Sequence, residues 1–402
     1  MKKQENQLMM WRDEELLSPF SGATLKRDTA HSLTDGKTRF PVIAEIPYLR
    51  ADRDDLREEV LRKLDANDEQ SALTLLLQDQ DDWAKTDAPT ESDLKPLFAD
   101  QKITLREAMN YLQYGAVADY FAYRWSDPTF LSGLNLLENH LPPSAQKVFE
   151  LACGIGHFLR EMSLRGIGAA GADVVFSKLW LARKFVAPTV KLVCLDANFD
   201  LPFAEKSYDA AFCHDAFYFL PKKNHVAAEL ERIVNQAILI GHAHNADAEN
   251  FSSGAAVAVD EYAAMFAIAA IYDDAELTKA LIENRPPNAQ TIAQLKKTEA
   301  VSLATTKRNS ADSVKFSLPP TNRHLRLNPL FETDAAAVAN APQYPSERYE
   351  KEYAALSDYL DLNDEDVSDS VRKKMAEGDW ADNEKTIEMV RRRIFLDVPE
   401  NW

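Results

Sequence analysis

The sequence predicts an α/β protein whose core is a doubly wound, Rossmann-like sheet between about residues 104 and 245. Two patterns indicate this fold class. Short apolar runs alternate with helical patterns, as expected of strands that helices cover on both faces. A glycine-containing loop at residues 150–156 follows the first of these runs. In doubly wound sheets, this first turn is where the chain comes closest to a bound ligand.

The spacing of apolar residues places the individual elements of this core. Strands are expected at residues 148–151, 168–173, 190–195, 210–214 and 237–241. Helices are expected between them at residues 158–165, 177–185 and 223–234. Strand and helix therefore alternate along the chain, which favours a parallel sheet with helical crossovers.

The rest of the 402-residue chain is expected to add smaller units to this core. Residues 1–50 predict a small β-hairpin unit, because Asp35-Gly36 separates extended segments. Residues 51–103 predict an acidic helical linker, 104–250 the core, and 251–402 a mainly helical carboxy-terminal extension able to form a lid and the last strands of the sheet. In that extension, helices are expected at 262–272, 346–360 and 382–393, and a strand at 323–331.

Composition narrows the function classes. The net charge of -18 and the pI near 5.0 disfavour nucleic acid as a partner, since phosphate backbones are bound by Lys and Arg. The three cysteines lie near predicted strand ends of one sheet, which argues against a disulfide framework. Residues 1–6 lack the apolar run of a signal peptide, and no apolar stretch reaches bilayer length. We expect a cytoplasmic protein with no membrane partner; its oligomeric state is left open.

Gly154 and Gly156 lie in the loop after the first predicted strand. Without side chains they allow a sharp bend and let a cofactor approach the main chain, while amides at the start of the next helix offer donors. The dinucleotide-binding pattern requires a third glycine at position 159, which is Leu159 here. Taken alone, Gly-x-Gly also fits an ordinary tight turn.

Acidic residues end the next two predicted strands. Asp173 lies at the distance along the chain expected of a carboxylate that accepts from both ribose hydroxyls. Asp196 ends the third strand. Each acid alone also fits a helix cap. Asp209, before the fourth strand, is interpreted as a cap of the preceding turn rather than a ligand-binding residue.

Together, the segment Glu150–Gly156, the two acids and Leu201-Pro202-Phe203 resemble the class I S-adenosylmethionine-dependent methyltransferase family, of the methyltransferase domain 11 type, over residues 145–240. The resemblance implies that the glycines line the methionine end of the cofactor, that Asp173 binds the ribose, and that Asp196 with the Ala197 amide reads the adenine. The implied cofactor-binding residues are Glu150, Ala152, Gly154, Gly156, Asp173, Val174, Asp196, Ala197, His214 and Arg124.

The amino-terminal unit resembles the Trm112-like zinc ribbon found at the front of some bacterial methyltransferases. Its knuckle positions here read Ser18-Pro19-Phe20-Ser21-Gly22, and the unit contains no cysteine. Because serine hydroxyls are poor zinc ligands, the resemblance implies a ribbon that has lost its metal. The alternative is a plain β-hairpin cap on the main domain.

Methyl transfer needs a base only for some acceptors, and histidine titrates in the right range. The candidate catalytic residues are His214, His242 and His244, which follow the fourth and fifth predicted strands. They also fit local hydrogen bonding, or a metal site, although their spacing is no established ligand motif and no metal is assigned. The candidate substrate residues are the aromatic side chains Tyr114, Tyr123, Phe217 and Tyr218. Arg124 is a candidate partner for the methionine carboxylate. For the aromatic helices, packing against the sheet is the alternative.

The function these observations favour is methyl transfer from S-adenosylmethionine to an oxygen or nitrogen of a small metabolite or natural-product intermediate. The first alternative is a peptide or protein methyltransferase that docks its substrate through the amino-terminal unit and the carboxy-terminal tail. The second is a NAD-dependent enzyme or a cofactor-binding scaffold without turnover. The missing third glycine argues against NAD.

Overall fold

The computed structural model describes residues 10–80, 85–100, 102–250, 254–309, 313–332, 338–339, 341–362 and 367–402. The chain forms two compact units. Unit 1 contains residues 1–114, 144–240 and 401, and unit 2 contains residues 115–143, 241–400 and 402. Residues 1–6, whose sequence lacks the apolar run of a signal peptide, lie outside the described residues.

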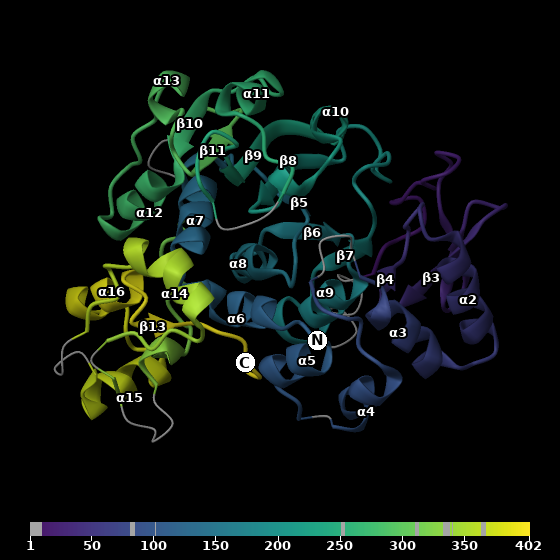
Figure 1. The fold of residues 1–402 in the computed structure, drawn as a ribbon, viewed down its shortest axis with the longest axis horizontal. Helices are drawn as coiled ribbons and strands as arrows, with labels where there is room; N and C mark the ends of the chain where they lie inside the picture. The colour runs from purple at the N-terminus through teal and green to yellow at the C-terminus, as the bar shows by residue number, and fades with distance from the viewer. Residues whose placement is uncertain are drawn as a thin grey trace. The chain divides into compact units, whose positions relative to one another are not determined.

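Within the described ranges, the main sheet has seven strands in the order β10-β11-β9-β8-β5-β6-β7 (Figure 1). Their bounds are β5 Lys147–Leu151, β6 Gly168–Asp173, β7 Lys191–Cys194, β8 Tyr208–His214, β9 Val234–His244, β10 Ala270–Asp273 and β11 Ala300–Ala304. Strand β5 pairs in parallel with β6 and β8, and β6 pairs in parallel with β7. Strand β10 pairs antiparallel with β11. The predicted α/β class with a Rossmann-like sheet is confirmed.

The five predicted core strands correspond to β5 through β9. Their sequences are short apolar runs, such as the buried 148–151 stretch of β5, because helices cover parallel strands on both sides. Strand β9 runs beyond the predicted end at residue 241 and carries His242 and His244 inside the strand.

Three helices follow strands β5, β6 and β8, as predicted. They are α8 His157–Leu164, α9 Phe176–Leu181, which continues into a π-turn at Ala182–Val186, and α10 Lys223–Ile233. The acidic linker forms α2 Asp54–Asp65, α3 Glu69–Gln78 and α4 Glu91–Ala99, and α5 Leu105–Tyr111 follows at the start of the predicted core. Capping boxes at Thr90 and Thr104 fix where α4 and α5 begin.

The amino-terminal segment folds as a four-stranded antiparallel sheet of β1 Lys26–Thr29, β2 Ser32–Thr34, β3 Arg39–Ile43 and β4 Ile46–Pro47. The predicted turn at Asp35-Gly36 joins β2 to β3, with Gly36 in the left-handed region at φ 89°. This sheet also contacts the edge strand β7. The Leu49 amide donates to the Cys194 carbonyl at 2.7 Å, and Trp11 Nε1 donates to the Leu192 carbonyl at 2.8 Å. An edge strand exposes unpaired backbone groups, and this unit covers them.

Unit 2 combines helices with the last strands of the main sheet. Its elements, besides β10, β11 and the end of β9, are α6 Ala116–Tyr123, α7 Pro128–His140, α11 Val259–Ala264, α12 Asp274–Ile282, α13 Ile292–Leu295, α14 Glu347–Tyr353, α15 Asp369–Glu377, α16 Glu384–Arg391, and the separate pair β12 Arg326–Leu327 and β13 Phe395–Leu396. Single 3-10 turns lie at Arg124–Ser126, Pro329–Phe331 and Ala354–Leu356.

Two predictions for this extension were wrong in part. The stretch 262–272 was expected to be one helix, but α11 ends at Ala264 and the chain enters β10 at Ala270. The segment 323–331 contains β12, which pairs with β13 rather than with the main sheet. Alanine-rich runs favour helix intrinsically, but packing next to β11 overrides that preference for 270–273.

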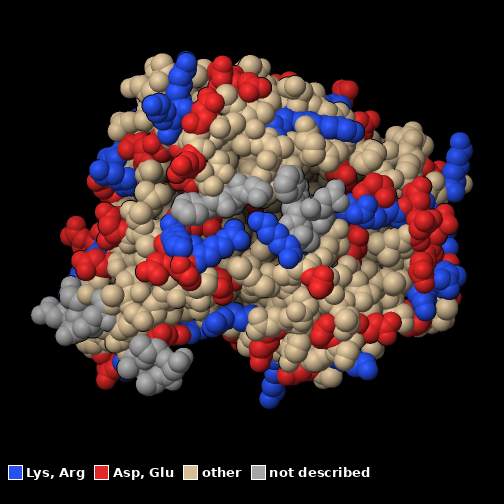
Figure 2. All heavy atoms as spheres, in the orientation of Figure 1, with Lys and Arg blue, Asp and Glu red and all other residues tan. Residues whose placement is uncertain are grey.

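Acidic side chains gather along the right-hand edge of the face in Figure 2, over the region where Figure 1 places α2. This helix carries the exposed acids Asp54, Asp55, Glu58 and Glu59. Among the helices described, none has the length and apolar character needed to span a bilayer.

Candidate functional site

The loop between β5 and α8 has an unusual backbone. Ala152, Gly154 and Gly156 all adopt positive φ, at 55°, 54° and 86°. Cys153 donates its amide to the Ala172 carbonyl at 2.9 Å, which ties the loop to the end of β6. An alanine in the left-handed region is uncommon and signals a backbone that its surroundings hold in place.

Asp173 connects this loop to the end of β6. One carboxylate oxygen accepts from the Gly154 amide at 2.9 Å, and the other accepts from the Val175 amide at 3.0 Å. The side chain is buried, with Lys178 Nζ 3.8 Å away. A carboxylate has about four lone-pair sites. Two such sites are therefore left for the hydroxyls of a ribose, so the residues present fit the cofactor that the sequence implies.

Gly171 performs the packing role that the missing third glycine would have had. A Cβ on Gly171 would lie 2.4 Å from Leu159 Cδ1 and 2.8 Å from Cys153 Sγ. In the dinucleotide pattern, a glycine in the helix permits close approach of helix and strand. Here the helix keeps a leucine and the strand supplies the glycine. The absent glycine at 159 is therefore compensated inside the fold.

Replacing Gly171 with alanine should lower the free energy of unfolding by about 1–3 kcal/mol, because the new methyl group overlaps Leu159 and Cys153. Chemical denaturation of the full chain measures this loss. In Gly171→Ala/Leu159→Ala the loss should be smaller than the sum of the two single losses, since the residues touch. Additive losses would contradict the close contact.

The following strand ends supply Val174 and Asp196. The Val174 carbonyl accepts from Arg50 Nη1 at 3.0 Å. Arg50 is buried and also pairs with Asp52 and, at 3.5 Å, with Asp79. Asp196 is half-buried, and its Oδ1 accepts from both the backbone and the side-chain amide of Asn198 at 2.9 Å. This local bonding matches a turn cap. Both bonds from Asn198 go to the same carboxylate oxygen of Asp196, Oδ1.

Cys153 and Cys213, which both feel the charge of Glu150, are held as thiols. Burial raises the pKa of Cys153 well above its usual value, and the charges of Glu150 and Asp173 raise it further. Burial likewise raises the pKa of Cys213, with Glu150 again adding to the shift. A protonated thiol is a poor nucleophile, so neither side chain is suited to covalent catalysis.

At the end of β8, His214 lies in an aromatic cluster. Its ring stacks on Phe212 with centroids 5.5 Å apart, and the Phe158 ring meets it edge-on at 4.9 Å. Phe217 and Tyr218 form a 3-10 turn, Phe217–Phe219, just beyond the strand, and both are buried. The Tyr218 hydroxyl donates to Asp215 at 3.0 Å. Unit 1 also holds Tyr114, whose hydroxyl lies 2.9 Å from Ser177 Oγ.

Unit 2 contains the other aromatic and arginine candidates, Tyr123 and Arg124. Arg124 is buried, with its Nη1 3.6 Å from Asp127 and its guanidinium 4.5 Å from the Tyr120 ring centroid. The Tyr123 ring meets Tyr349 and Trp402 edge-on at 6.0 and 5.5 Å. These contacts join the helix to the carboxy-terminal segment, which is the packing role that was the alternative. Their roles in cofactor and substrate binding stay predictions.

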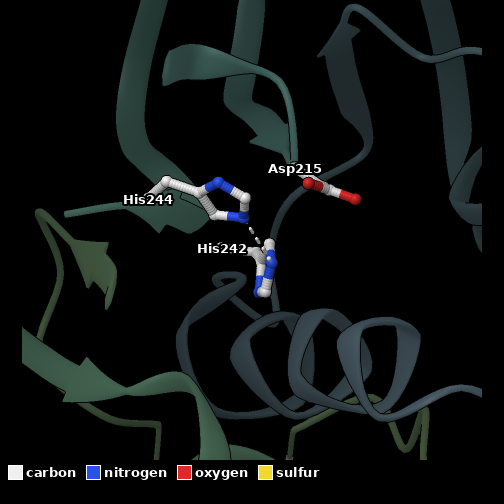
Figure 3. Close-up of side chains that lie close together, drawn as sticks. All are labelled: Asp215, His242 and His244. Atoms are coloured by element: carbon white, nitrogen blue, oxygen red, sulfur yellow. Dashed lines mark hydrogen bonds between the residues drawn. The ribbon is translucent and has the colours of Figure 1, made fainter. Parts of the chain in front are cut away.

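His242 and His244 lie together at the carboxyl end of β9 (Figure 3). Their Nε2 atoms are 3.2 Å apart. His242 Nδ1 lies 2.7 Å from Asp274 Oδ2, so the carboxylate accepts from that ring. His242 has φ 48° within the strand. Ligands of doubly wound sheets bind beyond the carboxyl ends of strands, where these side chains stand.

Residues 149–237 match the family model Methyltransf_11, described as a methyltransferase domain. This part of the chain is therefore a methyltransferase domain. The hydrogen bonds around Gly154 and Asp173 fit S-adenosyl-L-methionine as the cofactor of such a domain. The matched span begins at Phe149 in β5 and includes the glycine loop, Asp173, Asp196 and His214. No curated protein matches the chain in sequence.

Solved structures resemble the methyltransferase chain at low identity. Phosphoethanolamine N-methyltransferase 2 of Haemonchus contortus, in complex with S-adenosyl-L-methionine, is 17% identical with a TM-score of 0.36, over 52% of this chain and 60% of its own. A TehB-like methyltransferase from Corynebacterium glutamicum is 16% identical with a TM-score of 0.36, over 50% and 97%. An S-adenosylmethionine-dependent methyltransferase from Mesorhizobium loti is 16% identical with a TM-score of 0.32, over 42% and 93%. The assignment depends on the family match and not on these likenesses.

The structure adds residues that sequence reasoning missed. Arg50 supports the backbone beside Asp173, and Asp274 holds His242. Lys223 donates to the carbonyls of Tyr218 and Leu220 at 3.1 and 2.7 Å, and burial lowers its pKa to about 8. The sequence around these three residues does not indicate their roles. Gly171 differs from them, because a glycine inside an apolar strand pattern often marks a close approach of the backbone.

Proposed function

We propose that this methyltransferase acts on an oxygen or nitrogen of a small molecule, a metabolite or natural-product intermediate, and that histidines of β9 accept the proton that this atom loses. The observation that carries the proposal is the hydrogen-bonded pair His242 and His244 at the carboxyl end of that strand. A paired imidazole is useful for an acceptor that must lose a proton, as a hydroxyl or ammonium group must.

S-adenosylmethionine supplies a methyl group on a sulfonium centre, so much of the rate enhancement comes from alignment and the exclusion of water. The chain's own contribution begins with the loop at Gly154. Asp173 fixes that loop and, in this proposal, accepts from the ribose hydroxyls. Asp196 and Ala197 lie beyond β7, where the proposal assigns adenine recognition.

The proposed test offers the full chain S-adenosylmethionine carrying a radioactive methyl group, together with a cell extract separated into small molecules and proteins. Label should enter the small-molecule fraction at least tenfold faster than with the variant Asp173→Ala. Label that enters only the protein fraction would favour the peptide or protein alternative. A chain that binds the cofactor but labels neither fraction would overturn the proposal.

We interpret the amino-terminal unit as a metal-free structural cap rather than a docking module. The knuckle serines are engaged locally: Ser18 Oγ accepts from the amides of Phe20 and Ser21 at 3.3 Å, and Ser21 Oγ donates to Asp35 at 2.6 Å. The unit also bonds to edge strand β7 through Leu49 and Trp11. Deleting residues 1–100 should therefore abolish cofactor binding and activity together. Loss of protein modification alone, with cofactor binding kept, would support docking instead.

A further inference from the structure

Buried in unit 2 is a continuous chain of hydrogen bonds that ends on a carboxylate. His244 Nε2 and His242 Nε2 are 3.2 Å apart, and His242 Nδ1 lies 2.7 Å from Asp274 Oδ2. The exposed fractions of the His242 and Asp274 side chains are 15% and 8%. A carboxylate can only accept, so Nδ1 of His242 carries its proton and Nε2 holds a lone pair.

Asp274 is built to remain ionised. It is the first residue of α12, where the helix dipole favours negative charge. Ser302 Oγ donates to its Oδ1 at 2.5 Å, and Ser132 Oγ lies 2.6 Å from its Oδ2. Three donors therefore converge on one buried carboxylate: Ser302 of β11, Ser132 of α7 and His242 of β9. Buried charges are stabilised by such hydrogen bonds.

The backbone of β9 is strained where this chain of bonds passes through it. His242 has φ 48° inside a strand, which costs on the order of 1–3 kcal/mol and is frequent at functional sites. Its amide donates to Ser302 Oγ at 3.0 Å, so the same serine holds both the strained backbone and the carboxylate.

We propose that Asp274 is a positioning residue which fixes the proton order in the His242–His244 pair, so that the pair takes up the proton of the methyl acceptor. This inference rests on the function proposed above. With Nδ1–H of His242 bonded to Asp274, its Nε2 accepts from Nε2–H of His244. The remaining ring nitrogen, His244 Nδ1, is a buried atom, and it is the atom to which the proposal assigns the incoming proton.

The step balances in atoms and charge. The acceptor's oxygen or nitrogen forms a bond to the methyl carbon with its lone pair, and the carbon–sulfur bond breaks with its electrons passing to sulfur. The acceptor's proton moves to His244 Nδ1, and the Nε2 proton of His244 moves to His242. His242 becomes an imidazolium whose charge faces Asp274, which stabilises it. Another acid close to His242 is Glu299, whose pKa burial raises although the charge of His242 acts against that shift.

The test compares Asp274→Asn with the matched control Asp273→Asn. Asp273 is the adjacent N-cap of α12, where its Oδ1 accepts from the Ala275 amide at 3.0 Å and where asparagine caps equally well. Two-bond proton–nitrogen spectra of the histidine rings in the full chain report the tautomer, with His242→Gln identifying the His242 signals. We expect Nδ1–H in the wild type and in Asp273→Asn, and a shift toward Nε2–H in Asp274→Asn. An unchanged tautomer in folded Asp274→Asn overturns the inference.

Turnover provides the second measurement, with the labelled methyl group and the small-molecule fraction as the probe. Asp274→Asn should lower the rate of label transfer by about 10- to 100-fold while affinity for S-adenosylmethionine is unchanged. Equal rates in the two variants would overturn the inference. If the wild type itself transfers no label, the proposed function fails, and the tautomer measurement still decides whether Asp274 orients His242. If Asp274→Asn does not fold, Ser302→Ala takes its place, because it removes a hydroxyl that donates to Asp274. It should shift the His242 tautomer toward Nε2–H, and an unchanged tautomer in folded Ser302→Ala overturns the inference.

Discussion

Asp173→Asn should weaken S-adenosylmethionine binding by on the order of 100-fold, measured by calorimetry on the full chain. The wild-type carboxylate accepts from the amides of Gly154 and Val175 at 2.9 and 3.0 Å. Asparagine has nearly the same size, but its NH₂ group must face one of these N–H donors. It also removes the negative charge expected to accept from the ribose hydroxyls. Loop geometry and ribose binding are therefore lost together.

Asp209→Asn is the matched control for this substitution. Asp209 Oδ2 also accepts from two backbone amides, those of Gln146 and Lys147 at 2.7 and 2.9 Å. These bonds lie at the beginning of β5, whereas Asp173 acts at the carboxyl ends of the strands, where the cofactor is expected. Cofactor affinity should be unchanged in Asp209→Asn. Equal weakening in both variants would show a general effect on the sheet, and wild-type affinity in Asp173→Asn would refute the ribose assignment.

The core strands were predictable because burial leaves a strong local signal. Parallel strands covered on both faces must be short apolar runs, and β5 to β8 follow that rule. The end of β9 broke the pattern. His242 and His244 alternate with small residues, a pattern that predicts a loop. The strand nevertheless continues through both residues, with His242 in a left-handed conformation. The contact of its amide with Ser302 on β11 supports that conformation, and no local pattern reports this contact.

The cofactor loop was predictable and its supports were not. Glycines and acids that follow predicted strands at a regular distance along the chain indicate a cofactor loop. Gly154 and Asp173 could therefore be predicted from their positions in the sequence. Arg50 and Asp274 act across separations of 124 and 32 residues, on Val174 and His242 respectively. Each is an ordinary charged residue in the sequence. Their roles come from tertiary contacts, which single-sequence periodicity does not encode.

His140 should make the stability of unit 2 fall by about 3 kcal/mol as the pH is lowered from 6.5 to 4. Burial lowers the pKa of His140 to about 4. Its Nδ1 lies 2.9 Å from the Thr306 carbonyl and its Nε2 2.8 Å from the Tyr272 hydroxyl. This is the bonding of a neutral ring, in which Nδ1–H donates to the carbonyl and Nε2 accepts from the hydroxyl. A second ring proton would face the Tyr272 hydroxyl and require it to turn.

The direction follows from proton binding. Between pH 6.5 and 4, His140 is protonated in the unfolded chain but stays neutral in the folded chain. Proton binding therefore favours the unfolded state, and the free energy of unfolding decreases as the pH is lowered. Below about pH 4 both states bind the proton, and the histidine adds no further loss. Urea denaturation at several pH values, in wild type and in His140→Gln, isolates this contribution, because glutamine does not titrate while the carboxylates do so equally in both proteins. The variant should lose less stability than the wild type across this window. Parallel curves for the two proteins would show that His140 is protonated in the folded state, and that Tyr272 does not hold its ring neutral.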